Sequence, residues 1–243
     1  MKINTDQKRF YAILGLPSSG TSIISRFFHS LTNAFCIVEP FHKDGLGAKP
    51  ILEFDKVGPL QMQGTPTEFL RQLHQKLHHG PYQMGGIKEV DLFRQERATR
   101  FERCLDYHDF DCFIFIVRDP KANYNSIRRR KNTFSDVPIG VFVESCIRFH
   151  YLQKELRKKG KQVFVISYEA FCNANSQVDY INQIFGEFAT IEGAFHLPPV
   201  EKPFWVAVEQ TAVRNQGMKP PKMEYPLLRW QEVSVINQYC YFK

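Results

Sequence analysis

Residues 10–28 (FYAILGLPSSGTSIISRFF) contain the residue types and spacing that bind an oxyanion. The apolar residues 10–16 are typical of a buried strand, residues 17–20 are small loop formers, and apolar residues fall at helical spacing from Thr21. A strand, a tight loop and a helix in this order turn backbone N–H groups and the positive end of a helix dipole toward one point. The predicted turn, which is P-loop-like, is formed by Ser18, Ser19, Gly20, Thr21 and Ser22.

The segment from Gly15 to Ser22 differs at one position from the nucleoside-triphosphate pattern G-x-x-x-x-G-K-[ST]. Both glycines and the final Ser22 are present, but Thr21 occupies the position of the lysine that grips the phosphates. This mismatch argues against ordinary use of ATP or GTP. A P-loop nucleotide kinase stays open as an alternative, which a dependence on magnesium would favour.

A second motif begins at residues 111–117 (DCFIFIV), another apolar run typical of a buried strand, which leads into Arg118 and, eight positions later, Ser126. With both motifs in this order, the sequence resembles the sulfotransferases that use 3′-phosphoadenosine 5′-phosphosulfate (PAPS). In that family a P-x-S-G-T-[ST] loop holds the 5′-phosphosulfate, and the Arg and Ser of R-[DN]-P-x-x-x-x-x-S hold the 3′-phosphate. The resemblance therefore implies that Arg118 and Ser126 bind the 3′-phosphate, a role that suits a guanidinium fork and a hydroxyl near a helix start.

The resemblance covers residues 10–186 in order and implies a further nucleotide contact at Tyr168. Tyr168 follows a predicted strand at residues 162–167, in a segment that resembles the family's Y-E-[DA]-[LF], where the Tyr lies against the adenosine end. Arg214 belongs to a basic, glycine-containing loop that partly matches the family loop closing over the nucleotide, and a surface turn explains it equally well.

Three residues are candidates for the chemistry itself. Glu39 follows the predicted strand 34–38, at the strand end where ligands of open α/β sheets gather. The sequence resembles many sulfotransferases in carrying a Glu there, and in several of them this Glu is the catalytic base. The alternative for Glu39 is a carboxylate that caps a loop. His42 is the second-ranked candidate base: an imidazole titrates near neutral pH, but a lone His in a loop is more often structural. Lys88, in the predicted strand 85–90, matches a strand-end Lys that contacts the sulfuryl group in the family.

Two positions depart from the family pattern. Cytosolic members commonly have K-x-H at the third strand, but the third position here is Val90, which favours Glu39 as the base. Ser18 occupies a position that is usually Lys or Arg in the family. That basic side chain helps neutralise the charge that builds up on the bridging oxygen as the sulfuryl group leaves. Lys88, Lys43 or a C-terminal basic residue could substitute for that cation. A nucleotide-binding protein of the same fold without turnover is the alternative that Ser18 supports.

Length and pattern predict the architecture. With 243 residues, of which 43% are hydrophobic, the chain can bury a sizeable core, and one domain over residues 1–243 is the simplest organisation. We expect an α/β fold of three layers around a central, mostly parallel sheet of about five strands. A helix is predicted from a Thr65 cap to His79, and a long amphipathic helix from residues 137–138. Residues 43–64 have little periodicity and predict a long loop.

Composition bears on partners and compartment. The net charge of +7 suits an anionic cosubstrate, and because the basic residues are spread along the chain we expect neither a nucleic-acid nor a membrane partner. Six cysteines lack metal-ligand spacing, and the sequence has no run of about 18 apolar residues and no signal-peptide core at its start. These features predict a cytoplasmic protein that requires no metal. The apolar side chains of Trp205, Trp230 and residues 239–242 (YCYF) favour core packing, an acceptor pocket or a homodimer contact.

Together these features predict a PAPS-dependent sulfotransferase that moves the sulfuryl group to a hydroxyl or amine, leaving 3′-phosphoadenosine 5′-phosphate (PAP). In this hypothesis Glu39 takes the acceptor proton, and Lys88 with Thr21 and Ser22 stabilises the transferred group. We expect the acceptor to be a small molecule.

Overall fold

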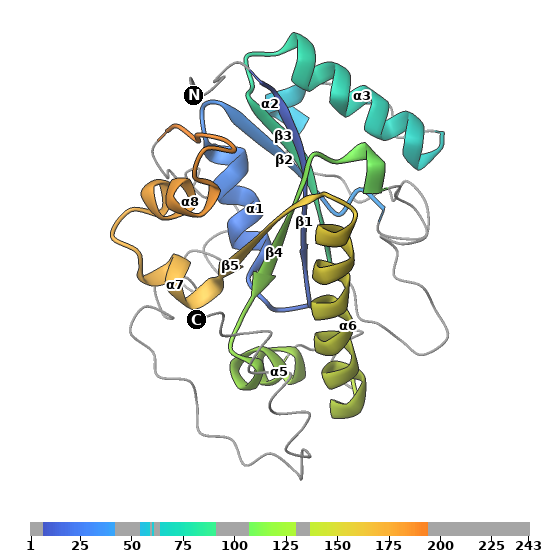
Figure 1. Ribbon diagram of the computed structural model, residues 1–243, viewed down its shortest axis with the longest axis vertical. Helices are drawn as coiled ribbons and strands as arrows, with labels where there is room; N and C mark the ends of the chain where they lie inside the picture. The colour runs from blue at the N-terminus through green and yellow to red at the C-terminus, as the bar shows by residue number, and fades with distance from the viewer. Residues whose placement is uncertain are drawn as a thin grey trace.

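The central sheet of the protein has five strands, all parallel, in the order β2-β3-β1-β4-β5. The computed structural model (Figure 1) describes residues 7–41, 54–58, 60, 64–90, 107–129 and 137–193. The strands are β1 (Arg9–Gly15), β2 (Ala34–Val38), β3 (Met84–Val90), β4 (Cys112–Val117) and β5 (Gln162–Ser167). Each apolar run that predicted a strand forms one, and the expected α/β fold is confirmed.

Helices cover both faces of this sheet, which gives three layers (Figure 1). Along β1, Phe10, Ala12 and Leu14 join a core with α3 and α6, whereas Tyr11 and Ile13 join a second core with α1, α7 and α8. The helices are α1 (Thr21–Ser30), α2 (Phe54–Val57), α3 (Pro66–His79), α5 (Pro120–Arg128), α6 (Ile139–Lys158), α7 (Tyr168–Asn173) and α8 (Gln177–Phe185), with a 3₁₀ turn η1 (Tyr107–Asp109).

Two helices confirm the sequence prediction and one does not. Helix α3 begins with the expected capping box, in which the Thr65 hydroxyl accepts from the Glu68 N–H and the Glu68 carboxylate accepts from the Thr65 N–H. Helix α6 begins directly after Pro138. The prediction of a long loop over residues 43–64 was wrong at residues 54–57, which form the short helix α2. Lys56 of α2 donates to the backbone carbonyls of three residues around the end of α1, namely His29, Leu31 and Ala34.

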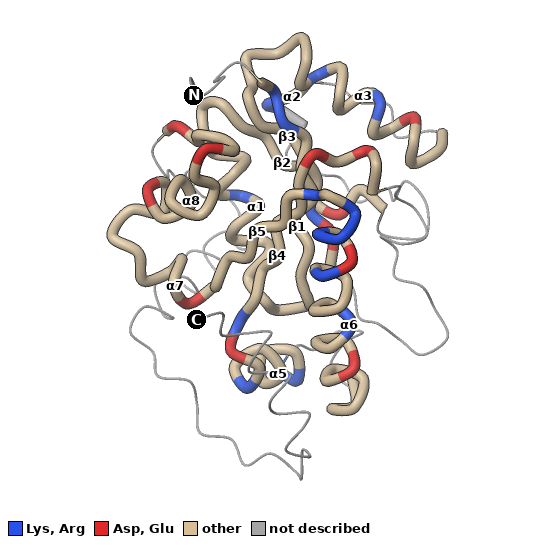
Figure 2. Tube along the Cα trace, in the orientation of Figure 1, with Lys and Arg blue, Asp and Glu red and all other residues tan. Residues whose placement is uncertain are grey.

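Charge on the described surface is mixed: Figure 2 shows basic and acidic residues together along α3 and α6. None of the described helices combines the length and the apolar composition that crossing a membrane needs. The four cysteines in this part of the chain are buried thiols: Cys36, Cys112, Cys146 and Cys172. The organisation of residues 1–243 as one domain extends beyond the described ranges and stays a prediction.

Parallel strands place their carboxyl ends at one edge of the sheet, and this edge gathers the predicted site residues. The turn after β1, Glu39 after β2 and Arg118 after β4 all lie there, with α5 directly beyond β4 (Figure 1). The β1–β3 register adds Lys88, which pairs with Ile13 two residues before Gly15 ends its strand. Since Ile13 belongs to the core that α1 covers, Lys88 lies on the α1 face of the sheet.

Strand β3 requires glycine where aromatic side chains lie across it. A Cβ at Gly86 would overlap the carbonyl oxygen and the ring of Tyr11, and one at Gly85 would overlap the ring of Phe35. We predict that Gly86→Ala lowers the free energy of unfolding by about 1–3 kcal/mol, because overpacking displaces β3 from β1. Gly140→Ala is the control, since a Cβ there meets nothing within 4 Å and should change stability by less than about 1 kcal/mol. Urea denaturation of both variants measures this, and equal stabilities would contradict it.

Candidate active site at the carboxyl edge of the sheet

The turn between β1 and α1 has an unusual backbone. Ser18 and Gly20 both have positive φ angles, 64° and 98°, in the left-handed region. The Ser19 N–H donates to the Leu16 carbonyl at 3.1 Å, which closes the turn, and α1 begins at Thr21. A non-glycine residue in the left-handed region stores strain, and such positions occur disproportionately at ligand sites.

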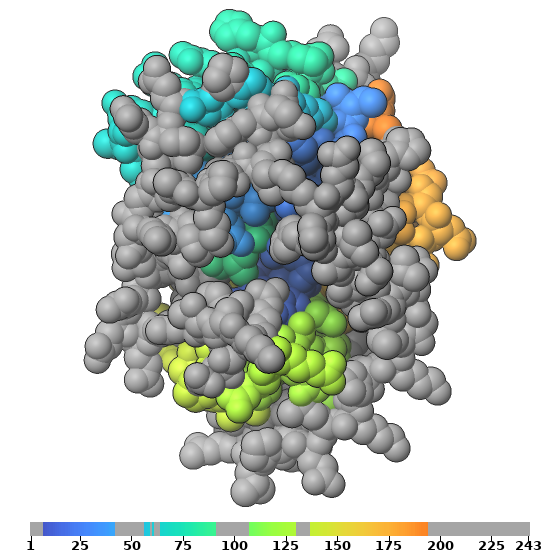
Figure 3. Space-filling view, turned by 180° about the vertical axis from the view of Figure 1, so that it is seen from behind, coloured from blue at the N-terminus to red at the C-terminus, as the bar shows by residue number. Residues whose placement is uncertain are grey.

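The turn is packed so closely that a Cβ at either of its two glycines would overlap a neighbouring side chain. A Cβ at Gly15 would overlap the Thr21 side chain and lie 2.6 Å from the Ser19 hydroxyl. A Cβ at Gly20 would overlap the ring of Tyr168, which is 1% exposed. Tyr168, at the start of α7, therefore packs directly on the turn. Figure 3 shows the neighbouring surface from behind, where the dark blue N-terminal segment lies next to the lime-green atoms of α5.

The turn has polar groups that the described residues leave without a hydrogen-bond partner. The hydroxyls of Ser18 and Ser19 are buried and make no hydrogen bond within the described part of the chain. Helix α1 has no side-chain cap there, and the N–H groups of its first residues, Thr21 and Ser22, have no acceptor within an α-helix. Buried polar groups are normally satisfied, so this cluster of donors suits an anion. Phosphate binding by the turn stays a prediction.

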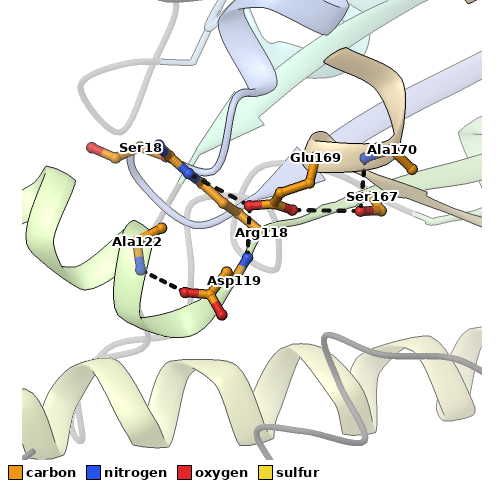
Figure 4. A network of polar contacts seen from close by, with 7 residues as sticks. All are labelled: Ser18, Arg118, Asp119, Ala122, Ser167, Glu169 and Ala170. Carbon is orange, nitrogen blue, oxygen red and sulfur yellow. Dashed lines mark hydrogen bonds and ion pairs between the residues drawn. The ribbon is translucent and has the colours of Figure 1, made fainter. Parts of the chain in front are cut away.

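Arg118 brings the second motif against this turn (Figure 4). Its Nη1 donates to the Ser18 carbonyl at 2.9 Å, and its guanidinium carbon lies 4.8 Å from the centroid of the Tyr168 ring. Its Nε is 3.9 Å from a carboxylate oxygen of Glu169, and its side chain is 13% exposed. The two motifs that the sequence separates by 100 residues are thus in direct contact.

Helix α5 begins after Arg118 with an ordinary cap. The Asp119 carboxylate accepts from the Ala122 N–H at 2.8 Å, and Pro120 occupies the first helical position. Ser126 lies in this helix, half-buried. Asn123 precedes Ser126 by three positions, so the two share a face. Asn123 is 3% exposed, and its side-chain oxygen has no hydrogen-bond partner among the described residues. No sequence pattern pointed to Asn123.

Glu39 and Lys88 form an ion pair at the ends of the neighbouring strands β2 and β3. The Lys88 Nζ is 2.5 Å from a Glu39 carboxylate oxygen, and the Glu39 N–H donates to the Lys88 carbonyl at 2.7 Å. The Lys88 side chain is 1% exposed and that of Glu39 is 21% exposed, so the cation is the more deeply buried partner. Glu39 has a φ of 48°, again in the left-handed region. The structure thereby joins the two residues predicted to act as base and as cation.

His42 and Arg214, together with the substitute Lys43, fall outside the described residues.

Burial raises the pKa of the Cys172 thiol, although a hydrogen bond with Tyr168 opposes the effect. Cys172 is therefore a protonated thiol at neutral pH and a poor nucleophile. Glu169 was missed as a site residue, although it directly follows Tyr168 in the Y-E-[DA]-[LF] resemblance.

Structural comparison identifies this arrangement of strands and helices. The chain is similar to the sulfotransferase domain of the Synechococcus PCC 7002 olefin synthase, with 12% identity, a TM-score of 0.57, and coverage of 100% of this chain and 98% of that one. This is a sulfotransferase fold. A mouse sulfotransferase, SULT7A1, complexed with PAP, also matches, with 16% identity, a TM-score of 0.37, and coverage of 86% of this chain and 66% of that one. The fold assignment rests on the olefin synthase domain, because a TM-score of 0.37 is too low to support one.

Sequence comparison adds no closer relationship. No family model matches the chain, and no curated protein matches its sequence. The sulfotransferase fold is therefore evident from the three-dimensional arrangement and from the two short motifs.

Because Glu39 pairs with a buried lysine, removing its carboxylate should lower the stability of the protein substantially. Glu39→Ala leaves the Lys88 ammonium buried and without its carboxylate, and we expect the free energy of unfolding to fall by about 3 kcal/mol. Replacing both partners, in Glu39→Ala/Lys88→Met, should recover much of this loss because the buried charge is gone. Glu144→Ala is the control: its i,i+4 pair with Arg148 lies at the surface, so the loss should stay below about 1 kcal/mol. Chemical denaturation of the four proteins measures these differences, and equal losses for Glu39→Ala and Glu144→Ala would contradict the burial argument.

Proposed function

We propose that this protein transfers the sulfuryl group of PAPS to a hydroxyl or amine of a small-molecule acceptor and releases PAP. The observation that carries the proposal is the hydrogen bond from Arg118 to the Ser18 carbonyl, because it joins the turn after β1 to the basic motif after β4. A nucleotide with phosphates at both its 5′ and 3′ ends requires two anion sites that lie close to each other in the fold. The sulfotransferase fold supports the same reading.

The 5′-phosphosulfate would lie on the turn of residues 16–20 and the N-terminus of α1. The buried hydroxyls of Ser18 and Ser19 and the first N–H groups of the helix supply donors there. The backbone donors do not depend on which side chain occupies position 18. They support an anion site even though Ser18 has no positive charge.

The 3′-phosphate would lie at Arg118, with Ser126 from the following helix as a neutral donor. A guanidinium pairs with phosphate through two parallel N–H groups, and its contact with the Tyr168 ring restricts the plane in which it can do so. Tyr168 packs on Gly20 and beside Arg118, so it lies between the two proposed phosphate positions and suits the adenosine end of the nucleotide.

The Glu39–Lys88 pair would supply the chemistry of transfer. As the acceptor oxygen or nitrogen forms its bond to sulfur, the Glu39 carboxylate takes the acceptor proton, and the bond from sulfur to the bridging oxygen of PAPS breaks. The electron pair of that bond leaves with PAP. Lys88 and the donors of Thr21 and Ser22 would stabilise the negative charge that develops on the transferred group and the bridging oxygen. Basic side chains and backbone dipoles supply this stabilisation, so the proposed mechanism requires no metal.

A thermal-shift titration tests the nucleotide site. We expect PAP at 100 times its dissociation constant to raise the melting temperature by about 5–10 °C, since it binds only the native state. AMP, which lacks the 3′-phosphate, should have a much smaller effect, and Arg118→Ala should remove the difference between the two ligands. Arg71→Ala removes an exposed charge on α3 and is the matched control. Stabilisation by ATP with magnesium but not by PAP would refute the proposal in favour of a kinase.

A turnover assay distinguishes an enzyme from a protein that only binds the nucleotide. With PAPS and a panel of phenols, alcohols and amines, the wild-type protein should release PAP and form a sulfated product. Glu39→Gln keeps a hydrogen-bond acceptor for Lys88 but removes the base, so turnover should fall by about 10²- to 10⁴-fold while PAP binding is retained. Release of PAP and sulfated product can be followed by chromatography. An unchanged rate in Glu39→Gln would exclude Glu39 as the base.

A further inference from the structure

We propose that Glu169 is a positioning residue that holds Arg118 and the start of α5 in the geometry that binds the 3′-phosphate. The inference rests on the proposed function, because it assigns a task at the same phosphate site. No residue pattern assigned a role to Glu169, and its contacts are the basis of the proposal (Figure 4).

The carboxylate of Glu169 joins three chain segments. One oxygen accepts from the Asp119 N–H at 3.0 Å and lies 3.9 Å from the Arg118 Nε. The other oxygen accepts from the Ser167 hydroxyl at 3.4 Å, and that hydroxyl in turn accepts from the Ala170 N–H at 3.3 Å. One side chain at the start of α7 is therefore tied to the end of β4, the cap residue of α5 and the end of β5.

The hydrogen bond to Asp119 is the contact that determines geometry. The side chain of Glu169 is 41% exposed, and an ion pair at 3.9 Å in such a position contributes little, because water and salt screen it. The hydrogen bond is shorter and joins an ionised acceptor to a backbone donor, which is the stronger kind. Because Asp119 follows Arg118 directly in the chain, the hydrogen bond from the Asp119 N–H to Glu169 fixes the backbone from which the guanidinium extends.

Arg118 is consequently restrained from three directions. The Ser18 carbonyl holds Nη1, the Tyr168 ring lies against the guanidinium face, and Glu169 holds the neighbouring backbone and faces Nε. A long arginine side chain loses rotamer freedom when it binds a phosphate, so a guanidinium already held in place binds with less entropic cost. The Glu169 charge itself repels a bound phosphate. Its benefit must therefore come from position and not from charge.

Two substitutions separate position from charge. Glu169→Gln keeps an oxygen at the same reach but removes the charge, whereas Glu169→Asp keeps the charge but is one methylene too short to reach the Asp119 N–H. We expect Glu169→Gln to bind PAP as tightly as the wild type or more tightly. Glu169→Asp and Glu169→Ala should bind PAP about 10-fold more weakly, with little change for AMP.

The experiment is calorimetric titration of PAP and AMP into the wild type, the three Glu169 variants, Arg118→Ala and the control Glu187→Ala, which removes an exposed carboxylate just after α8. The quantity to compare is the ratio of the AMP and PAP dissociation constants, because a general loss of folded protein changes both alike. A ratio that falls in Glu169→Ala and Glu169→Asp and is restored in Glu169→Gln supports the inference.

Two results would overturn the inference. An equal loss of PAP and AMP affinity in Glu169→Ala would show a general structural role, and a Glu169→Gln ratio as low as that of Glu169→Ala would show that the charge is required. Failure of the proposed function is distinguishable from both. In that case the wild type itself would not prefer PAP to AMP, and the positioning role would fall with it.

Discussion

The site depends on one topological constraint: every strand of the described sheet runs in the same direction. Parallel strands deliver all their carboxyl ends to one edge, so segments distant in sequence meet there without a dedicated interface. The turn after β1, Glu39 after β2, Lys88 near the end of β3 and Arg118 after β4 gather for this reason. Because β1 lies between β3 and β4, the turn after β1 lies between Lys88 on one side and Arg118 on the other.

Close packing then converts this proximity into contact. The ring of Tyr168 can rest on the turn only because position 20 has no Cβ, and Gly15 leaves room for Thr21 and Ser19 in the same way. The left-handed Ser18 belongs to this arrangement, since its carbonyl is the group that accepts from Arg118. Strain at Ser18 is therefore compensated by a charge-assisted hydrogen bond that also orders the guanidinium.

The sequence was sufficient to predict the elements that a local or periodic residue pattern determines. Continuous apolar runs such as residues 111–117 predicted buried strands, and the Thr65–Glu68 capping box predicted the start of α3, because those patterns determine structure within a few residues. Helix α2 could not be predicted, since it is only four residues long and Lys56 makes its contacts with distant carbonyls around the end of α1. The same holds within the site. Motifs located Arg118, Glu39 and Lys88, but the Glu39–Lys88 pair and the Glu169 bond to Asp119 arise from the order of strands in the sheet, which no single motif encodes.

The charges of Glu39 and Lys88 largely neutralise each other. Lys88 is buried with its ammonium against Glu39, so this corner presents a neutral pair and not a free cation to an approaching anion. With Ser18 in place of a basic residue, attraction for the proposed nucleotide would come mainly from Arg118 and from the hydroxyl and N–H donors of the turn. Oriented dipoles suit that task, because they need no counter-charge and no reorganisation as negative charge develops. The proposed mechanism divides the site in this way: the turn and Arg118 would bind the cosubstrate through fixed donors, and the Glu39–Lys88 pair would act in the transfer step.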